Sequence, residues 1–300
     1  MVSLLKKQFE SLIQLNPLLY KFYLKKRLSF KFKNEIQLIN NKSKTDSTHP
    51  SILHFSFQKS ATQYVKDLLT ICAQENNLTP IKLPDYAFNS NFPFLDQLQK
   101  DELEQYQYIF RKEGYLYTVF GDMVQHLENL NSYKVIFLTR DPRDILVSEY
   151  FSLRYSHPTP SLLSNKNQLF SERQQLAKTL PIDEFVLKDG DRLKLSYDNY
   201  NKFLIDKHKN IHLTSYENMM KNFPEWLDKI LNYCELTLPP DTKHQLIHNH
   251  THRTPIKENK RSHLRKATPG DYKNKLNPKT IEQLNIKFAE TLKLYYNDEP

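Results

Sequence analysis

The stretch HFSFQKSATQYVKDLL, residues 54–69, decides the fold of this 300-residue chain. A strand-like apolar segment runs into a short polar turn, and apolar residues then recur at helical spacing. A strand–turn–helix unit of this kind presents unpaired backbone N–H groups and the positive end of the helix dipole at the turn, which favours an anion there. The stretch contains no glycine, although phosphate loops are usually built from it. The residues therefore predict an anion site and leave the anion open.

Strand-like and helix-like segments alternate along the chain after residue 50. The expected strands are 51–57, 79–83, 115–120, 133–139 and 211–216, and the expected helices between them are 61–76, 98–112, 122–130 and 142–154. This alternation predicts an α/β fold of three layers, with a central, mostly parallel sheet flanked by helices, a P-loop-like strand–loop–helix and a helical C-terminal part. Ligands of such sheets bind at the carboxyl ends of the strands.

Composition indicates a folded chain with two basic regions. Hydrophobic residues make up 39% of the chain, and the formal net charge is +9. Residues 1–45 hold ten Lys and Arg against two acidic residues, and residues 253–279 hold nine against two. Such surfaces attract nucleic acid, acidic lipid, phosphorylated cofactors or polyanionic sugars, and composition does not choose among them. The two cysteines, Cys72 and Cys234, lie in helix-like patterns and suit free thiols in a reducing compartment, which favours a cytoplasmic location.

The first 48 residues are expected to form a basic helical extension and linker before a main domain at 49–300. Asn16 followed by Pro17 is typical of an N-cap and the first turn of a helix. A helical flank docked on the domain is the favoured interpretation, and a basic amphipathic anchor at a membrane surface is the alternative. No apolar run is long enough to span a membrane, and the first residues make a poor signal peptide.

The turn QKSATQY, residues 58–64, is the first candidate binding motif. Ser60, Thr62 and Gln63 can add side-chain donors to the helix N-terminus, and Lys59 can add a positive charge. A Walker A loop requires G-x-x-x-x-G-K-[ST], and here Leu53 and Gln58 occupy both glycine positions. A helix capped by Ser60 beside a solvated lysine is an equally acceptable interpretation of this turn alone.

The segment IFLTRDPRDILVS, residues 136–148, is the second candidate motif. Arg140 stands at the carboxyl end of an apolar strand, and Ser148 follows about two helical turns later. Arginine by its bidentate fork and serine by its hydroxyl could bind a second phosphate. Taken alone, the segment is better explained by a structural Arg–Asp pair that caps a helix.

Taken together, the two motifs resemble the cofactor signatures of the sulfotransferases that use 3′-phosphoadenosine 5′-phosphosulfate (PAPS). QKSATQY matches the family's P-K-S-G-T-T-W-like loop, and RDPRDILVS matches R-[ND]-x-[KR]-D-x-x-V-S. Two further segments, IHLTSYENMMKNFPEWLDKIL and LRKATPGDYKNKLNP, resemble later family signatures in the same order. The resemblance spans roughly residues 51–295. It implies a P-loop-like α/β enzyme that transfers a sulfuryl group from PAPS to a hydroxyl or amine, without a metal.

The resemblance also implies a role for individual residues. The loop would hold the phosphosulfate, with Lys59 on the leaving phosphate and Ser60, Ala61, Thr62 and Gln63 beside it. Arg140 and Ser148 would hold the 3′-phosphate. The residues that would lie near the adenine or clamp the nucleotide are Tyr64, Tyr216, Thr251, Arg265 and Lys266.

The general base is where the resemblance weakens. Many family members carry a catalytic histidine after the strand that corresponds to residues 115–120, and Phe120 occupies about that position here. A base must reach the acceptor's proton, and Asp122 or His126 could do so. Asp122 is the preferred candidate, although it could equally serve as a helix N-cap and His126 could simply face solvent.

Other functions remain open from the residues alone. A P-loop-type kinase, a catalytically inactive binder of PAPS or its product, and a polyanion-binding protein are the alternatives. The histidines of HQLIHNHTHRT, including His244 and His248, have no matching Glu or thiolate and are not expected to bind metal. Segments 84–112 and 154–180 are expected to shape the site of a small-molecule, lipid or carbohydrate acceptor. Nucleic acid is not an expected partner, and the oligomeric state does not follow from the sequence.

Overall fold

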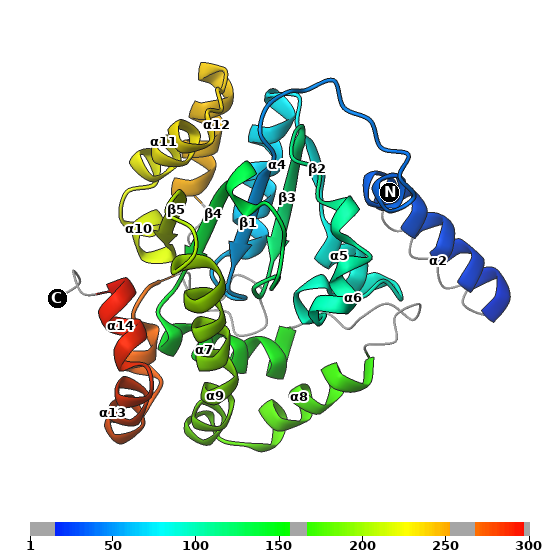
Figure 1. Cartoon of the computed structure of the whole chain (residues 1–300). Helices are drawn as coiled ribbons and strands as arrows, with labels where there is room; N and C mark the ends of the chain where they lie inside the picture. Colours follow the sequence, from blue (N-terminus) through cyan, green and yellow to red (C-terminus); the bar gives the residue numbers. More distant parts are fainter. Residues whose placement is uncertain (1–15, 157–166, 253–267, 297–300) are drawn as a thin grey trace.

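A parallel sheet of five strands forms the centre of the molecule (Figure 1). The computed structural model describes residues 16–156, 167–252 and 268–296. The strands are β1 (Ile52–Ser56), β2 (Thr79–Ile81), β3 (Tyr115–Phe120), β4 (Lys134–Thr139) and β5 (Ile211–Ser215), in the order β2-β3-β1-β4-β5. All four strand pairs are parallel. The predicted α/β fold with a central parallel sheet is confirmed, and the carboxyl ends of β3, β1 and β4 lie next to one another.

Helices cover both faces of the sheet. They are α2 (Pro17–Lys31), α3 (Lys33–Ile39), α4 (Thr62–Glu75), α5 (Leu83–Asn89), α6 (Lys100–Glu104), α7 (Pro142–Phe151), α8 (Asn167–Thr179), α9 (Ile182–Tyr200), α10 (Tyr216–Lys221), α11 (Phe223–Cys234), α12 (Pro240–Thr251), α13 (Pro278–Lys287) and α14 (Ala289–Tyr296). None of them is long and apolar enough to cross a membrane, within the part of the chain that the structure describes.

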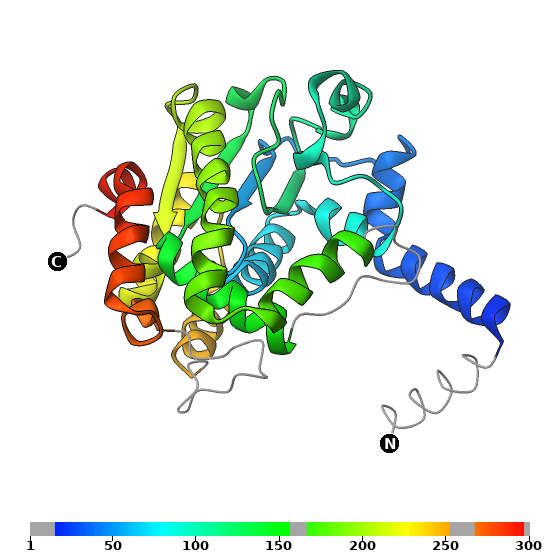
Figure 2. The same ribbon diagram turned by 90° about the horizontal axis from the view of Figure 1, so that it is seen from below.

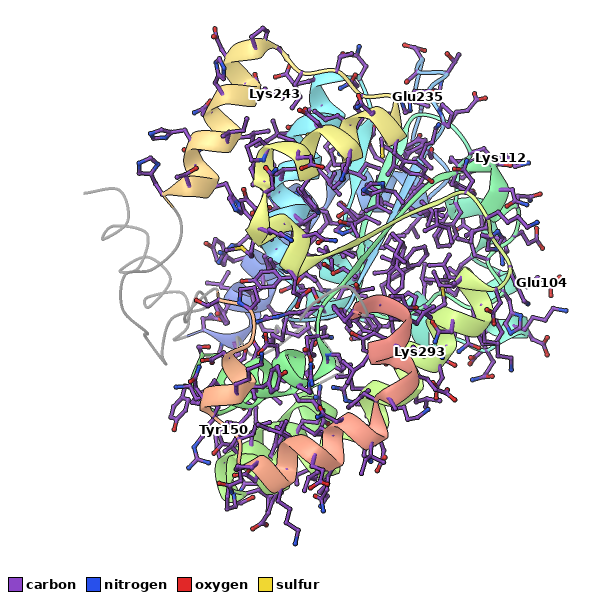
Figure 3. All side chains as sticks on the ribbon, turned by 90° about the vertical axis from the view of Figure 1, so that its left-hand side faces the viewer. Glu104, Lys112, Tyr150, Glu235, Lys243 and Lys293 are labelled. Atoms are coloured by element: carbon purple, nitrogen blue, oxygen red, sulfur yellow. The ribbon has the colours of Figure 1, made fainter. Side chains whose placement is uncertain are left out.

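Alternate side chains of the strands point into two separate apolar cores. In β4, Ile136 and Leu138 pack with residues of α4, α10 and α11, whereas Val135 and Phe137 pack with residues of α7 and α9. Side chains are packed densely between the sheet and the helices, while Glu104, Lys112 and Lys243 lie at the rim (Figure 3). Because β4 is buried on both faces, it appears in the sequence as an almost uninterrupted apolar run.

Of the helices expected from the sequence, the one at 122–130 is not formed and the one at 98–112 is much shorter than expected. Residues 122–130 form turns, because His126 and Asn129 adopt left-handed backbone conformations with φ of 62° and 53°. The helix expected at 98–112 is reduced to α6 and a 3₁₀ turn at Gln107–Ile109. The hydroxyl of Tyr117 accepts the N–H of Arg111 and donates to the carbonyl of Ile109, which holds this segment out of a helix.

The N-terminal helices differ in how they meet the domain. The side chain of Asn16 accepts the N–H groups of Leu18 and Leu19 at 3.1 and 3.2 Å, so the predicted cap of α2 is confirmed. Helix α2 contains no buried residue and projects away from the sheet (Figure 2). In contrast, Phe32 and Leu38 at either end of α3 are buried. The chain is thus anchored to the domain through α3, and α2 stands outside it.

Candidate functional site

The turn between β1 and α4, residues 57–61, is the candidate anion cradle, and it contains no glycine. Lys59 and Ala61 have φ of 70° and 59°, in the left-handed region that glycine usually supplies. Each such residue costs about 1 kcal/mol or more, a strain that is typical of functional loops. The hydroxyl of Ser60 is buried and has no hydrogen-bond partner among the described residues. The Ser60 hydroxyl is thus a donor without a partner at the N-terminus of the 14-residue helix α4, a position that suits a bound anion. Thr62 and Gln63 are the first two residues of this helix.

Lys59 carries the positive charge of this cradle. Its ammonium group donates to the hydroxyl of Ser152 at 2.7 Å. Burial lowers the pKa of Lys59 to about 8, and the nearby carboxylate of Glu149 partly opposes that shift. An anion bound beside Lys59 would favour its charged form and raise its pKa again.

Arg140 joins the second motif to the first. Its guanidinium donates to the carbonyl of Lys59 at 2.5 Å and lies 4.3 Å from the centre of the Tyr216 ring. The Nε of Arg140 is buried and has no hydrogen-bond partner in the described ranges. Ser148 is half-buried on α7, the helix that begins two residues after Arg140. The structure therefore brings the two predicted phosphate motifs into direct contact.

Asp144 anchors the C-terminal segment beside this arginine. Its carboxylate lies 3.6 Å from the Arg140 guanidinium and accepts the N–H groups of Gly270 and Tyr272 at 2.7 and 3.0 Å. The φ of Gly270 is 77°, which a residue with a side chain rarely adopts. Arg265 and Lys266 lie outside the described residues. The segment that follows them is nevertheless held next to Arg140.

Aromatic rings form a wall beside the start of α4. The hydroxyl of Tyr64 lies 3.0 Å from Nδ1 of His250, and the His250 ring stacks on Phe223 at 3.8 Å. His250 and Phe223 were missed as site residues, and the only signal in the sequence was the histidine-rich run itself. Thr251 follows His250, but its hydroxyl is exposed and donates to the carbonyl of Ile247, one turn back along α12.

Asp122 lies two residues beyond the end of β3, next to the loop of the first motif. Its carboxylate accepts the N–H of Met123 at 2.8 Å and the hydroxyl of Ser196 at 2.9 Å. A side chain at the preceding Gly121 would come within 3.5 Å of Gln58, which places this turn against the loop. Burial raises the pKa of Asp122. Phe120 is buried in the core and has no ionisable group, so it cannot act as a base in place of the family's histidine.

His126 is placed differently from its expected position. It lies in a turn rather than a helix, its side chain is exposed, and its ring is 5.6 Å from that of Phe203. No contact between His126 and the Lys59 loop is seen among the described residues.

Asp96 is a second carboxylate at this end of β3, and nothing in the sequence singled it out. It lies in the 3₁₀ turn Leu95–Gln97 and accepts the N–H of Asp122 at 3.2 Å. Burial and the charge of Asp122 raise the pKa of Asp96 to about 7. Asp96 and Asp122 are called the Asp96–Asp122 pair below, because the Asp96 carboxylate contacts the Asp122 backbone and the charge of Asp122 disfavours the charged form of Asp96.

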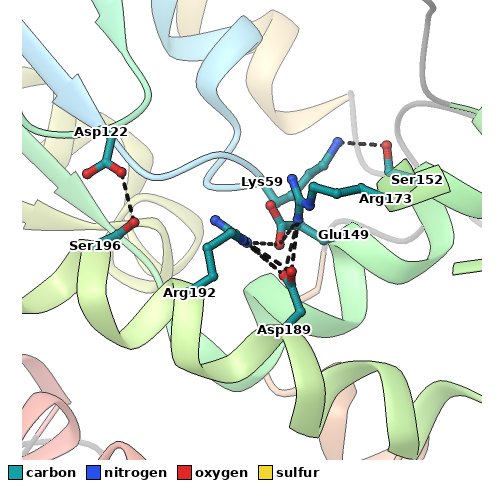
Figure 4. Close-up of polar contacts among 8 residues, drawn as sticks. All are labelled: Lys59, Asp122, Glu149, Ser152, Arg173, Asp189, Arg192 and Ser196. Atoms are coloured by element: carbon teal, nitrogen blue, oxygen red, sulfur yellow. Dashed lines mark hydrogen bonds and ion pairs between the residues drawn. The ribbon is translucent and has the colours of Figure 1, made fainter. Parts of the chain in front are cut away.

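A cluster of charged residues lies between Lys59 and Asp122 (Figure 4). Glu149 is buried and lies 2.6 Å from Arg192 and 3.3 Å from Arg173. Asp189 lies 2.7 Å from Arg192 and 3.1 Å from Arg173. Figure 4 shows Arg192 between the Asp122–Ser196 pair and the Lys59–Ser152 pair. Three helices, α7, α8 and α9, thus supply one polar wall of the site.

The site has two chemically different sides. On one side, the loop, the start of α4 and Arg140 offer donors and positive charge, which suits a ligand with two separate phosphate groups. On the other side, the Asp96–Asp122 pair offers proton acceptors. Within the described parts of the chain, no group of three or more His, Cys, Asp or Glu side chains could hold a metal ion.

Comparison with known proteins gives a consistent picture. The sulfotransferase domain profile matches residues 49–295. Sulfotransferase 2A1 of Homo sapiens is 28% identical over 178 residues, which is 53% of this chain and 56% of that protein. The chain thus matches about half the length of this curated relative.

Two solved structures of sulfotransferases were compared with this chain. The structure of a mouse sulfotransferase, SULT7A1, complexed with PAP has a TM-score of 0.54 at 17% identity, covering 88% of this chain and 91% of that chain. A sulfotransferase from Mycobacterium avium, STF9, is 11% identical with a TM-score of 0.45, covering 90% of this chain and 81% of that one. The mouse structure supports the same arrangement of sheet and helices.

Proposed function

This chain belongs to the sulfotransferase family, and we propose that it transfers the sulfuryl group of PAPS to a hydroxyl or amine acceptor. The observation that carries the proposal is the contact between the two phosphate motifs. The guanidinium of Arg140 donates to the carbonyl of Lys59, so the loop and the end of β4 form one continuous cradle. The unpaired hydroxyl of Ser60 and the unpaired Nε of Arg140 fit two anionic groups on a single ligand.

The positions of the described residues support the following proposed roles. Lys59, Ser60, Ala61, Thr62 and Gln63 would hold the phosphosulfate end at the N-terminus of α4. Arg140 and Ser148 would hold the 3′-phosphate, and Arg265 and Lys266 would close over it, since Asp144 anchors the chain that follows them. The residues proposed on the adenine side are Tyr64, Tyr216 and Thr251.

Lys59 is the residue proposed to stabilise the charge that develops in the reaction. When bound, PAPS would supply a sulfuryl group on a phosphate leaving group. The ammonium of Lys59 would lie at that phosphate and neutralise its growing charge, an effect that is strong where water is excluded. With a pKa near 8, Lys59 is mostly charged at neutral pH, and a bound anion would keep it so.

Asp122 is the proposed general base. It would accept the proton of the acceptor hydroxyl or amine while the acceptor oxygen or nitrogen bonds to sulfur. The raised pKa of Asp122 brings its basicity closer to neutral pH, as general bases require. Ser196 would orient the carboxylate by its hydrogen bond. His126 remains a less favoured candidate because it lies in an exposed turn.

The proposed acceptor is a small molecule, a lipid or a carbohydrate, and PAPS would be used without a metal. We place the reaction in the domain at 49–300, preceded by the extension at 1–48. The mouse sulfotransferase of similar fold is complexed with PAP, which supports a PAPS-derived nucleotide here. The free, buried Cys72 and Cys234 suit the proposed cytoplasmic location.

A product assay tests the proposal. The purified full-length chain would be incubated with PAPS and a panel of phenols, lipid alcohols and amino sugars. We expect adenosine 3′,5′-bisphosphate to be released together with a sulfated acceptor, detected by mass spectrometry. Lys59→Ala should abolish the release, whereas Lys229→Ala at an exposed position should not. Phosphorylated acceptors formed from ATP, with no turnover of PAPS, would contradict the proposal and favour a kinase.

A further inference from the structure

Helix α2 presents an apolar surface to solvent. Leu18, Leu19, Phe22 and Phe30 are exposed by 80%, 58%, 57% and 88%. Single exposed apolar residues are normal on protein surfaces, but four large ones on one 15-residue helix are not. These four residues are called the α2 surface below.

The α2 surface lies on the side of the helix that faces away from the domain. Leu18, Phe22 and Phe30 follow one another at spacings of four and eight residues, which places them along one side of a helix. The half-buried residues of α2 are Tyr20, Tyr23, Leu24 and Leu28, which follow a second, different side. The helix projects from the molecule beyond α5 and α6 (Figures 1 and 2). No described part of the domain therefore covers the α2 surface.

The charge around this surface has one sign. Residues 17–31 contain Lys21, Lys25, Lys26, Arg27 and Lys31 and no acidic residue. The ammonium of Lys26 lies 4.9 Å from the centre of the Phe22 ring, so a cation and an exposed aromatic side chain occupy the same patch. Exposed apolar side chains and lysines on one helix suit an anionic bilayer, whose acyl chains can take up the former and whose headgroups the latter.

Other occupants of the α2 surface fit less well. A second copy of the chain would bring two helices of the same strong positive charge together, which is unfavourable. Nucleic acid would satisfy the lysines through its phosphates but would leave Leu18, Leu19 and both phenylalanines without an apolar partner. An anionic lipid surface alone satisfies both features, through its headgroups and its acyl chains.

The connection to α3 makes α2 a firm attachment point. Phe32, directly after α2, is buried, and its ring lies 5.4 Å from that of Tyr86 in α5. Glu35 of α3 is buried and accepts the N–H of Lys82 at 2.6 Å. These buried contacts therefore tie the end of α2 to the domain through Phe32 and α3.

We propose that α2 docks this protein on an anionic membrane surface, with Leu18, Leu19, Phe22 and Phe30 inserted among the lipids and the lysines at the headgroups. The docking is independent of the proposed sulfuryl transfer.

Vesicle flotation with the full-length chain tests this docking. We expect binding to vesicles of phosphatidylcholine with phosphatidylserine to exceed binding to pure phosphatidylcholine vesicles by about tenfold or more, and to weaken in high salt. The double variant Phe22→Ser and Phe30→Ser should lose about tenfold or more of the partitioning. Replacing Lys21, Lys25 and Lys26 by Gln should weaken only the binding to the anionic vesicles.

A matched control separates the α2 surface from apolar exposure in general. Ile286 and Leu294 are 72% and 52% exposed on α13 and α14. The double variant Ile286→Ser and Leu294→Ser should bind the anionic vesicles as the wild type does. Equal binding by the phenylalanine variant and the wild type would overturn the proposal, as would the absence of vesicle binding by the wild type. Sedimentation velocity without lipid would show a dimer lost in the phenylalanine variant if a second copy were the true occupant, and this result would also overturn it.

Discussion

The two sides of the site are built in opposite ways. The proposed nucleotide side consists of the loop at 57–61, the start of α4, Arg140 just before α7 and Ser148 within α7. It depends on backbone N–H groups and on residues close together in the sequence. The proposed acceptor side collects Asp96, Asp122, Glu149, Arg173 and Arg192 from five different parts of the chain.

This difference teaches where each kind of function is encoded. A phosphate group requires a helix N-terminus and a few donors, which a short motif can supply. An acceptor requires a shape and a base that are set by distant side chains, which differ with the acceptor. We therefore expect substitutions on the nucleotide side to affect every acceptor equally and those on the acceptor side to depend on the acceptor used.

The largest effect is expected at Lys59. Lys59→Ala should lower turnover by about 10³-fold, because it removes the charge at the leaving phosphate. The affinity for adenosine 3′,5′-bisphosphate should fall by much less, since Arg140 and the helix N-terminus remain. Rapid-quench kinetics with PAPS, beside calorimetric titration of the bisphosphate, would measure both. Turnover equal to that of the wild type would remove Lys59 from the mechanism.

The next effect concerns the acceptor side and Asp122. Asp122→Asn keeps the size of the side chain but removes the base, and we expect turnover to fall by about 10²-fold with nucleotide affinity unchanged. His126→Ala should stay within about twofold of the wild type, because His126 lies in an exposed turn. Asp198→Asn, on the exposed part of α9, serves as the control for loss of an aspartate. The reverse ranking of Asp122 and His126 would identify the histidine as the base.

A smaller effect is expected at Ser148. Ser148→Ala should weaken binding of adenosine 3′,5′-bisphosphate by about tenfold, the usual effect of one hydrogen bond to a charged group. Binding of AMP, which has no 3′-phosphate, should not change. Isothermal titration calorimetry measures the affinity for both nucleotides. An equal loss of affinity for the two would place Ser148 away from the 3′-phosphate.

The smallest effect is a pH dependence of stability at Asp96. Its pKa is raised from 3.8 to about 7 in the folded state, so the folded chain holds this proton more tightly than the unfolded chain. The contribution of Asp96 to stability therefore decreases as the pH rises from about 4 to about 7. The free energy of unfolding of Asp96→Asn should therefore rise relative to that of the wild type between pH 5 and pH 8, by at most roughly 2–3 kcal/mol. Urea unfolding at both pH values measures the gain, and Asp101→Asn at an exposed position should show none.

The sequence singled out the two motifs of the proposed nucleotide side because their signals are local. The strands β1 and β4 stand out as apolar runs, and the motifs follow directly at their carboxyl ends. Even so, the contact of Arg140 with the Lys59 carbonyl became apparent only in the structure, since it joins residues 81 positions apart.

The acceptor side could not be predicted in the same way. Asp96 lies in a single 3₁₀ turn, and Ser196 and Arg192 lie on a long helix whose polar residues resemble any exposed face. The expected helix at 122–130 failed because two residues without special sequence signals, His126 and Asn129, adopt left-handed conformations. This side is determined by tertiary contacts between elements that are far apart in the sequence. Hydrophobic periodicity carries no information about such contacts.

Selective recognition of the 3′-phosphate tests the central claim most directly. Thermal unfolding of the full-length chain would be compared with adenosine 3′,5′-bisphosphate, ATP and AMP, each at the same concentration. The account predicts clear stabilisation by the bisphosphate, about 2.7 kcal/mol at a hundredfold excess over its dissociation constant, and much less by AMP. Stabilisation by ATP with none by the bisphosphate would contradict it.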